Sequence, residues 1–258
     1  MARVLLAAAA LLSALALVSC GNTSDTTAVT PYDLSGIWMN DDTLDERMKR
    51  EGRTRQTEAE LRGPSTTTAP AAPPLTPAYM AVYEQMRAEA ARQAEGTQTC
   101  EWPGMPTIMT YPYPFEVLTT PGRITFIFEV ESQVRRIFLD RTMHLPPEDL
   151  DPSYNGDSIG HWEGRTLVID TVGFNTYRPV RGLPHSDQLR IVERITPVDA
   201  DTITDEMTLT DPEAFTEPVV INVEYSRRPD WRIREYSCAE NNRDAPDASG
   251  QRSGAIVR

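Results

Sequence analysis

The second half of the chain alternates apolar and polar residues with a period of two, which is typical of half-buried β-strands. In the segment 189–196, Leu189, Ile191 and Ile195 fall on one side and Arg190 and Arg194 on the other. Comparable segments, bounded by Pro, Gly and Asp turn signals, cover 33–41, 124–131, 135–140, 166–172, 202–210, 219–226 and 231–238. Because short strands with short connections pair antiparallel, we expect a mainly β fold, an antiparallel up-and-down barrel.

One helix is predicted ahead of these strands, within an insert of loop and helix at 41–99. Thr76 can cap the helix, Pro77 suits its first turn and Gly96 suits its end. One face carries apolar residues at helical spacing, which predicts packing against the core. The residues of this face are Tyr79, Val82, Tyr83, Met86 and Ala90.

The first residues predict export. A short positive start and an apolar run at 4–18 form a signal peptide of residues 1–19, and the run is too short for a permanent membrane helix. Leu17-Val18-Ser19-Cys20-Gly21 matches the lipobox of bacterial lipoproteins, which makes Cys20 the lipid attachment site. An ordinary cleaved signal with a chance cysteine is the alternative.

This signal divides the rest of the chain into three parts. Residues 20–33 are predicted to be a lipidated tether, 34–242 a single β-barrel domain, and 243–258 a disordered polar tail. The expected location is the cell envelope, periplasmic and lipid-anchored. Gly21 stands where retention signals of the inner membrane place Asp, which favours the outer membrane.

Composition limits the kinds of partner that we expect, and the cysteine count predicts a disulfide. The net charge is −13 and Lys49 is the only lysine, which argues against nucleic acid and against a basic membrane patch. Contact with the membrane is therefore expected through the anchor alone. Cys100 and Cys238 remain after lipidation and predict one disulfide in an oxidising compartment, with two free thiols as the alternative.

Several predicted strands place a carboxylate on an otherwise apolar face, at Glu193, Asp205 and Glu235. A lone buried carboxylate is costly unless it is paired, protonated or beside a wet cavity. Two explanations stay open. The acids pair with arginines such as Arg123, Arg135, Arg136 or Arg194, or they line a ligand cavity in the barrel. In the second case Trp38, Asp205, Trp231 and Glu235 would contact the ligand.

His185 and Asp187 lie two residues apart on one strand face, the spacing of a general base and its orienting acid. Glu193 is an alternative partner for this base, and Arg136 would stabilise an anion. Alternatively, Asp187 caps a turn and His185 binds a backbone group. The three histidines match no metal signature, and no cofactor motif is present, so neither a metal nor a cofactor is expected.

Two resemblances bear on this fold. Gly36 and Trp38 in "SGIWMND" resemble the first-strand Gly-x-Trp of lipocalin-type barrels, which implies binding of a small hydrophobic molecule. The segments "TYPYPFEVLTTPG", "SIGHWEGRTLVID", "PHSDQLRIVERI" and "EYSCAENN" resemble a widespread family of secreted bacterial proteins. That family has no established activity, so this resemblance implies export and one fold without a reaction.

The second resemblance covers roughly residues 34–242. It implies that five residues stand at positions which the family keeps, namely Cys100, His185, Asp187, Glu193 and Cys238. Asp157 and His161 depart from the residues usual at their positions, which lowers any expected role for His161.

Three functional hypotheses follow. The first is a lipid-anchored periplasmic barrel that binds a small, partly apolar molecule. The second is a cofactor-free acid/base enzyme (lyase, hydratase, isomerase or hydrolase) that uses His185 and a carboxylate in the same pocket. The third is an envelope-assembly or interaction protein without a pocket. The sequence leaves the ligand and the oligomeric state open.

Overall fold

The computed structural model describes residues 32–40, 73–92 and 102–238. The predicted signal peptide, Cys20, most of the tether and of the insert, Cys100 and the tail lie outside these ranges, so the anchor and the disulfide stay predictions. Among the described residues, no helix has both the length and the apolar character needed to span a bilayer.

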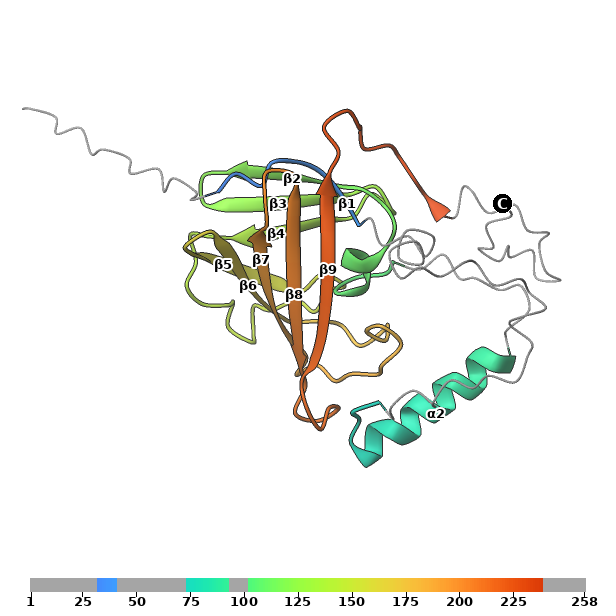
Figure 1. The fold of residues 1–258 in the computed structure, drawn as a ribbon. Coiled ribbons are helices and arrows are strands. Elements are labelled where there is room, and N and C mark those ends of the chain that lie inside the picture. The colour runs from blue at the N-terminus through green and yellow to red at the C-terminus, as the bar shows by residue number, and fades with distance from the viewer. Residues whose placement is uncertain (1–31, 41–72, 93–101, 239–258) are drawn as a thin grey trace, which may run out of the picture.

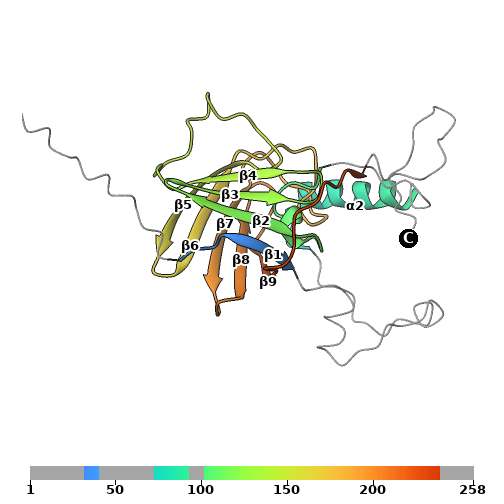
Figure 2. The same ribbon diagram turned by 90° about the horizontal axis from the view of Figure 1, so that it is seen from above.

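The strands close into a barrel in which each strand pairs with the next and β9 pairs back with β1 (Figures 1 and 2). They are β1 (Gly36–Asn40), β2 (Phe115–Thr120), β3 (Arg123–Phe128), β4 (Val134–Phe138), β5 (Asp157–Glu163), β6 (Thr166–Val172), β7 (Arg190–Pro197), β8 (Thr202–Thr210) and β9 (Val219–Arg227). The predicted barrel is therefore confirmed. One pair, β4 with β5, is parallel, because the segment 139–156 returns the chain before β5 begins.

Two strands lie where no strand was predicted, and one predicted strand is wrong. β2 directly follows Pro114, and β5 precedes the turn at Gly164. The segment 231–238 forms no strand and keeps a single bridge, between Tyr236 and Val130. The physical reason is the closure of the barrel: β1 occupies the free edge of β9, so no edge remains for another strand.

Aromatic and aliphatic side chains fill much of the barrel interior. Trp38, Phe115, Phe126 and Tyr225 are buried, and the ring of Phe115 meets those of Phe126 and Tyr225 edge to face, with centroids 5.5 and 5.1 Å away. The short helix η1 (Thr107–Thr110) packs against the barrel, with Ile108 and Met109 buried. There the Tyr225 hydroxyl donates to the carbonyl of Met109 over 2.8 Å.

The helix α2 (Pro77–Arg92) lies outside the barrel, beside one end of it (Figure 1). The segment before α2 is held to the turn after β8, where the amide of Thr76 donates to the carbonyl of Ala214 and its hydroxyl to that of Glu213, both over 2.8 Å. The predicted packing of the apolar face is found in part. Tyr79 and Tyr83 contact the core and are half-buried, whereas Val82 is 43% exposed.

Candidate functional site

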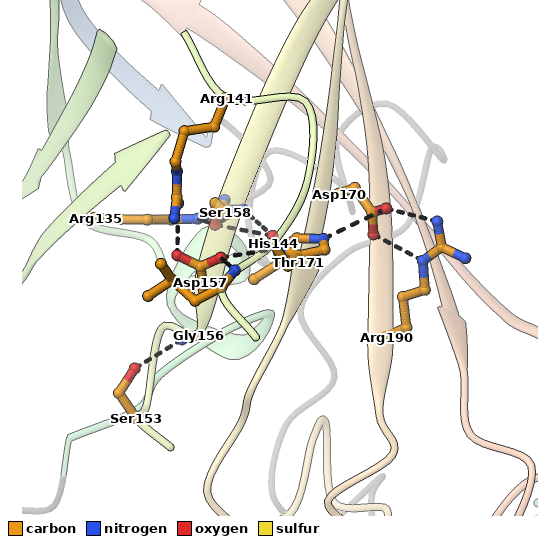
Figure 3. Close-up of polar contacts among 11 residues, drawn as sticks. Arg135, Arg141, His144, Ser153, Gly156, Asp157, Ser158, Asp170, Thr171 and Arg190 are labelled. Carbon is orange, nitrogen blue, oxygen red and sulfur yellow. Dashed lines mark hydrogen bonds and ion pairs between the residues drawn. The ribbon is translucent and has the colours of Figure 1, made fainter. Parts of the chain in front are cut away.

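The barrel interior holds an ion pair between Arg135 of β4 and Glu193 of β7, predicted as one of the alternatives for the buried acids. The Arg135 guanidinium donates to both carboxylate oxygens of Glu193, one of them over 2.8 Å. It also donates to the hydroxyls of Ser158 and Thr171, which are 2.9 Å from each other (Figure 3). Each of the three guanidinium nitrogens therefore donates to at least one acceptor inside the barrel.

Strand alternation decides which of two adjacent arginines joins this network. Arg135 and Ile137 point inward, so Arg136 lies on the outer face and is exposed. Arg136, which we predicted beside Glu193 as an anion stabiliser, therefore does not share a pocket with Glu193. Its neighbour Arg135 provides the interior cation.

Asp205 of β8 is the second interior carboxylate and lies diagonally from Glu193 in the strand register, since Ile195 is opposite Asp205. Its side chain is fully buried, and neither carboxylate oxygen has a hydrogen-bond partner among the described residues. Burial, and then the negative charge of Glu193, raise the pKa of Asp205 well above its ordinary value. Burial without a hydrogen-bond donor therefore favours the protonated, neutral form of Asp205 over the ionised form.

The four residues predicted to contact a ligand do not gather at one place. Trp38 and Asp205 are inside the barrel and buried, whereas Trp231 is 46% exposed and Glu235 is exposed on the segment after β9. Trp231 lines a groove of 610 Å³ on the outer surface, with Ile233 and Glu129. The expectation that Glu235 faces an internal pocket is wrong, because its segment never enters the barrel.

A second groove, of 620 Å³, lies between α2 and the loop that leads to β7, and we call it the helix groove. Its volume is within the range of small-molecule sites. Tyr79, Val82 and Met86 form the helix side. The opposite side consists of Tyr177, Arg178, Pro184, His185, Asp187 and Glu213, among others. Two of the predicted catalytic residues, His185 and Asp187, therefore line this groove, outside the barrel.

His185 is held in the wall of the helix groove by the backbone. Its Nδ1 is 2.8 Å from the carbonyl oxygen of Ser186, and its Nε2 is 3.0 Å from that of Arg178. Both ring nitrogens thus face acceptors, and the ring is 8% exposed. This arrangement matches the alternative in which His185 satisfies a backbone group, and it places a carbonyl oxygen of the chain in front of each ring nitrogen.

Asp187 does not pair with His185. It is exposed at the groove and has no hydrogen bond or ion pair within the part of the chain that the structure describes. Asp211 supports the loop instead, because its carboxylate accepts from the amide and the hydroxyl of Ser186, over 2.6 and 2.8 Å. It also accepts from the amides of Glu213 and Ala214, both over 3.0 Å. The sequence analysis did not predict this supporting role of Asp211.

Sequence reasoning also missed a charged cluster on the outer face of β5 and β6. His144, on the connection from β4 to β5, lies between two carboxylates: its Nδ1 is 3.0 Å from Asp157 and its Nε2 3.5 Å from Asp170 (Figure 3). Arg141 donates to Asp157 over 2.6 Å, and Arg190 donates twice to Asp170, over 2.8 and 2.5 Å. The cluster holds the crossing connection against the barrel wall.

The carboxylates of this cluster have lowered pKa values. For Asp157, partial burial acts to raise the pKa, but hydrogen bonds from Arg141 and His144 outweigh it. For Asp170, burial is likewise outweighed, here by Arg190. Both acids are therefore ionised at neutral pH, which suits a structural salt-bridge cluster. Within the described ranges, no group of three or more His, Cys, Asp or Glu side chains is arranged to hold a metal ion.

Comparison with known proteins adds little to this geometry. No family model matches the chain, and no curated protein matches it. Among solved structures, the crystal structure of Treponema pallidum Tp0751 (Pallilysin) covers 59% of this chain and 98% of its own, with 13% identity and a TM-score of 0.24. A similarity at this level carries no functional inference, and the resemblance to a family of secreted proteins stays a prediction.

Proposed function

We propose that this is a lipid-anchored envelope protein that binds a small, partly apolar molecule in the helix groove, with the barrel as the rigid support. The observation that carries the proposal is the 620 Å³ groove walled by Tyr79, Val82 and Met86 on one side and by polar loop residues on the other. A pocket with apolar walls and a few polar groups is typical of small-molecule sites.

The side chains inside the barrel support a binding site outside it. Large side chains and the Arg135–Glu193 network occupy the space that a lipocalin-type ligand would need. The site we propose is therefore outside the barrel, at the junction of α2 and the loop 176–187. Cys20 would attach the chain to the membrane.

The same geometry gives less support to an acid/base enzyme. His185 lines the groove, but both of its ring nitrogens are engaged by carbonyl oxygens. Asp187 is at the groove without contacting His185. Binding needs no proton acceptor, so it is the function that these residues support best.

Methionine methyl NMR tests the proposal, because Met86 lines the groove whereas Met143 is 77% exposed at a distant surface. The probe is a panel of small aromatic and aliphatic alcohols, amines and carboxylates. We expect at least one member to shift the Met86 methyl signal saturably and to leave Met143 unchanged. Val82→Trp, which fills the groove from the helix side, should abolish the shift.

Val198→Trp is the matched control, because Val198 is 58% exposed and lies on the turn between β7 and β8. It should bind the panel as the parent protein does. If no member shifts Met86, or if Val82→Trp responds as strongly as the parent, the groove is not a binding site.

A further inference from the structure

The helix groove carries more negative than positive charge. Asp187 and Glu213 line it, and both are exposed. Asp187 has no partner within the described residues, and Glu213 accepts a hydrogen bond only from the neutral side chain of Gln188 among the interactions described. One arginine, Arg178, also lines the groove, and it already has an interaction within the chain.

A third carboxylate lies beneath this surface. Asp211 is buried, and all of its described donors are neutral: the amide and hydroxyl of Ser186 and the amides of Glu213 and Ala214. No cation from the chain therefore neutralises it within the described contacts. Its carboxylate accepts from Ser186, a residue that lines the groove, and its charge acts on Tyr79 together with those of Asp187 and Glu213.

Tyr79, on the helix side, responds to this field. Burial raises the pKa of its phenol, and the negative charges of Asp211, Glu213 and, more weakly, Asp187 raise it further. Burial disfavours a charge of either sign, but the carboxylate part of this shift reports a negative potential, and a negative potential favours a cation.

Aromatic rings provide the apolar part of such a site. Tyr79 and Tyr177 line opposite sides of the groove, and Tyr177 is 77% exposed. An exposed aromatic ring binds apolar groups, and its face attracts an ammonium group. Val82 and Met86 extend the apolar surface along α2.

We infer that the ligand of the helix groove is a partly apolar cation, an amine or a quaternary ammonium on an aliphatic or aromatic body. The ammonium would lie near Asp187 and Glu213, and the apolar body would lie against Tyr79, Met86 and Val82. This inference rests on the proposed binding function and adds the charge of the ligand.

Three probes that share the same phenylbutyl group and differ in charge separate binding in the groove from preference for a cation. They are phenylbutylamine, phenylbutanol and phenylbutyrate. Titrations that follow the Met86 methyl signal give a Kd for each. We expect the amine to bind about threefold to tenfold more tightly than the alcohol, and the carboxylate most weakly. Added salt should reduce the preference for the amine.

Substitution of Asp187 and Glu213 tests whether these two carboxylates cause the preference for the amine. In Asp187→Asn/Glu213→Gln the amine should bind no better than the alcohol. The control Asp230→Asn/Glu217→Gln removes the same charge from two exposed residues away from the groove and should keep the preference.

The outcomes distinguish the two proposals. If the alcohol and the amine bind equally in the parent protein, or if the double variant keeps the preference, the cation inference is overturned and groove binding stands. If none of the three probes shifts Met86 and the wider panel also fails, both proposals fall together.

Discussion

Arg135 and Glu193 form an ion pair in the closed interior of the barrel, with 1% and 0% of their side chains exposed. They come from β4 and β7, which are not neighbours in the sheet, so the pair joins two opposite walls. Removing a charge from water is costly, and mutual attraction with full hydrogen bonding offsets that cost. The pair therefore makes the fold sensitive to the loss of either partner.

Glu193→Gln should lower the free energy of unfolding by about 3–5 kcal/mol, because it leaves the Arg135 charge buried without a counterion. Urea unfolding at neutral pH measures the effect. The control is Glu163→Gln, which breaks an exposed ion pair with Arg194 and should leave stability nearly unchanged. The double variant Arg135→Met/Glu193→Leu should recover most of the loss. Equal stability of Glu193→Gln and the parent protein would contradict the role of the pair.

Asp205→Asn should gain stability relative to the parent protein as the pH rises. The folded-state pKa of Asp205 is raised, so between about pH 4 and that raised value the unfolded chain releases a proton that the folded chain keeps. Stability contributed at this residue is therefore lost as the pH rises. Asparagine does not titrate, so the stability of the variant relative to the parent protein should increase from about pH 4 to about pH 8.

Urea unfolding at both pH values, with the exposed Asp230→Asn as control, measures this difference. The control should show no such trend. A difference between the variant and the parent protein that is the same at both pH values would mean that the folded-state pKa of Asp205 is not raised.

The placement of Glu193 and Asp205 shows what the sequence could predict. On a strand, the period of two puts a residue on the same side as its second neighbours, and the flanking Ile191, Ile195 and Met207 identify that side as buried. The short strand β4 is different. It has apolar residues on both faces beside Arg135 and Arg136, so five residues do not decide which arginine points inward.

The residues that sequence reasoning missed depend on contacts between distant segments. From the sequence, His144 is considered only as one of three histidines without a metal signature, and its two carboxylates come from strands that pair only after the chain has folded. Met86 and Val82 show the same limit. Their helical spacing predicts a buried face, but the barrel closes on itself, so α2 packs outside and its apolar face lines a groove.

Asp157→Asn should weaken the attachment of the connection between β4 and β5. It removes the charge that pairs with Arg141 and His144 and should cost about 1–2 kcal/mol at neutral pH. The pKa of Asp157 is lowered in the folded protein, so its contribution is present at neutral pH and is lost as the pH falls below about 4. The deficit of the variant should therefore shrink in acid.

Hydrogen exchange followed by mass spectrometry should show faster exchange in peptides from 139–156 in this variant. Asp149→Asn, an exposed change on the same connection, is the control and should exchange as the parent protein does. Unchanged protection in Asp157→Asn would mean that the connection is held by its other contacts.

His185→Ala should destabilise the protein, in contrast to the expectation for a catalytic base. The imidazole lies between the carbonyl oxygens of Ser186 and Arg178 and is buried, so its loss removes the N–H donor from one of these acceptors and leaves a cavity. We expect a loss of about 1–3 kcal/mol in the free energy of unfolding. Faster hydrogen exchange should be confined to peptides from 176–189.

His161→Ala is the matched control, since that ring is 65% exposed and contacts only Glu163 among the described residues. If His185→Ala unfolds at the same urea concentration as the parent protein, His185 does not hold the loop, and a role in proton transfer regains support.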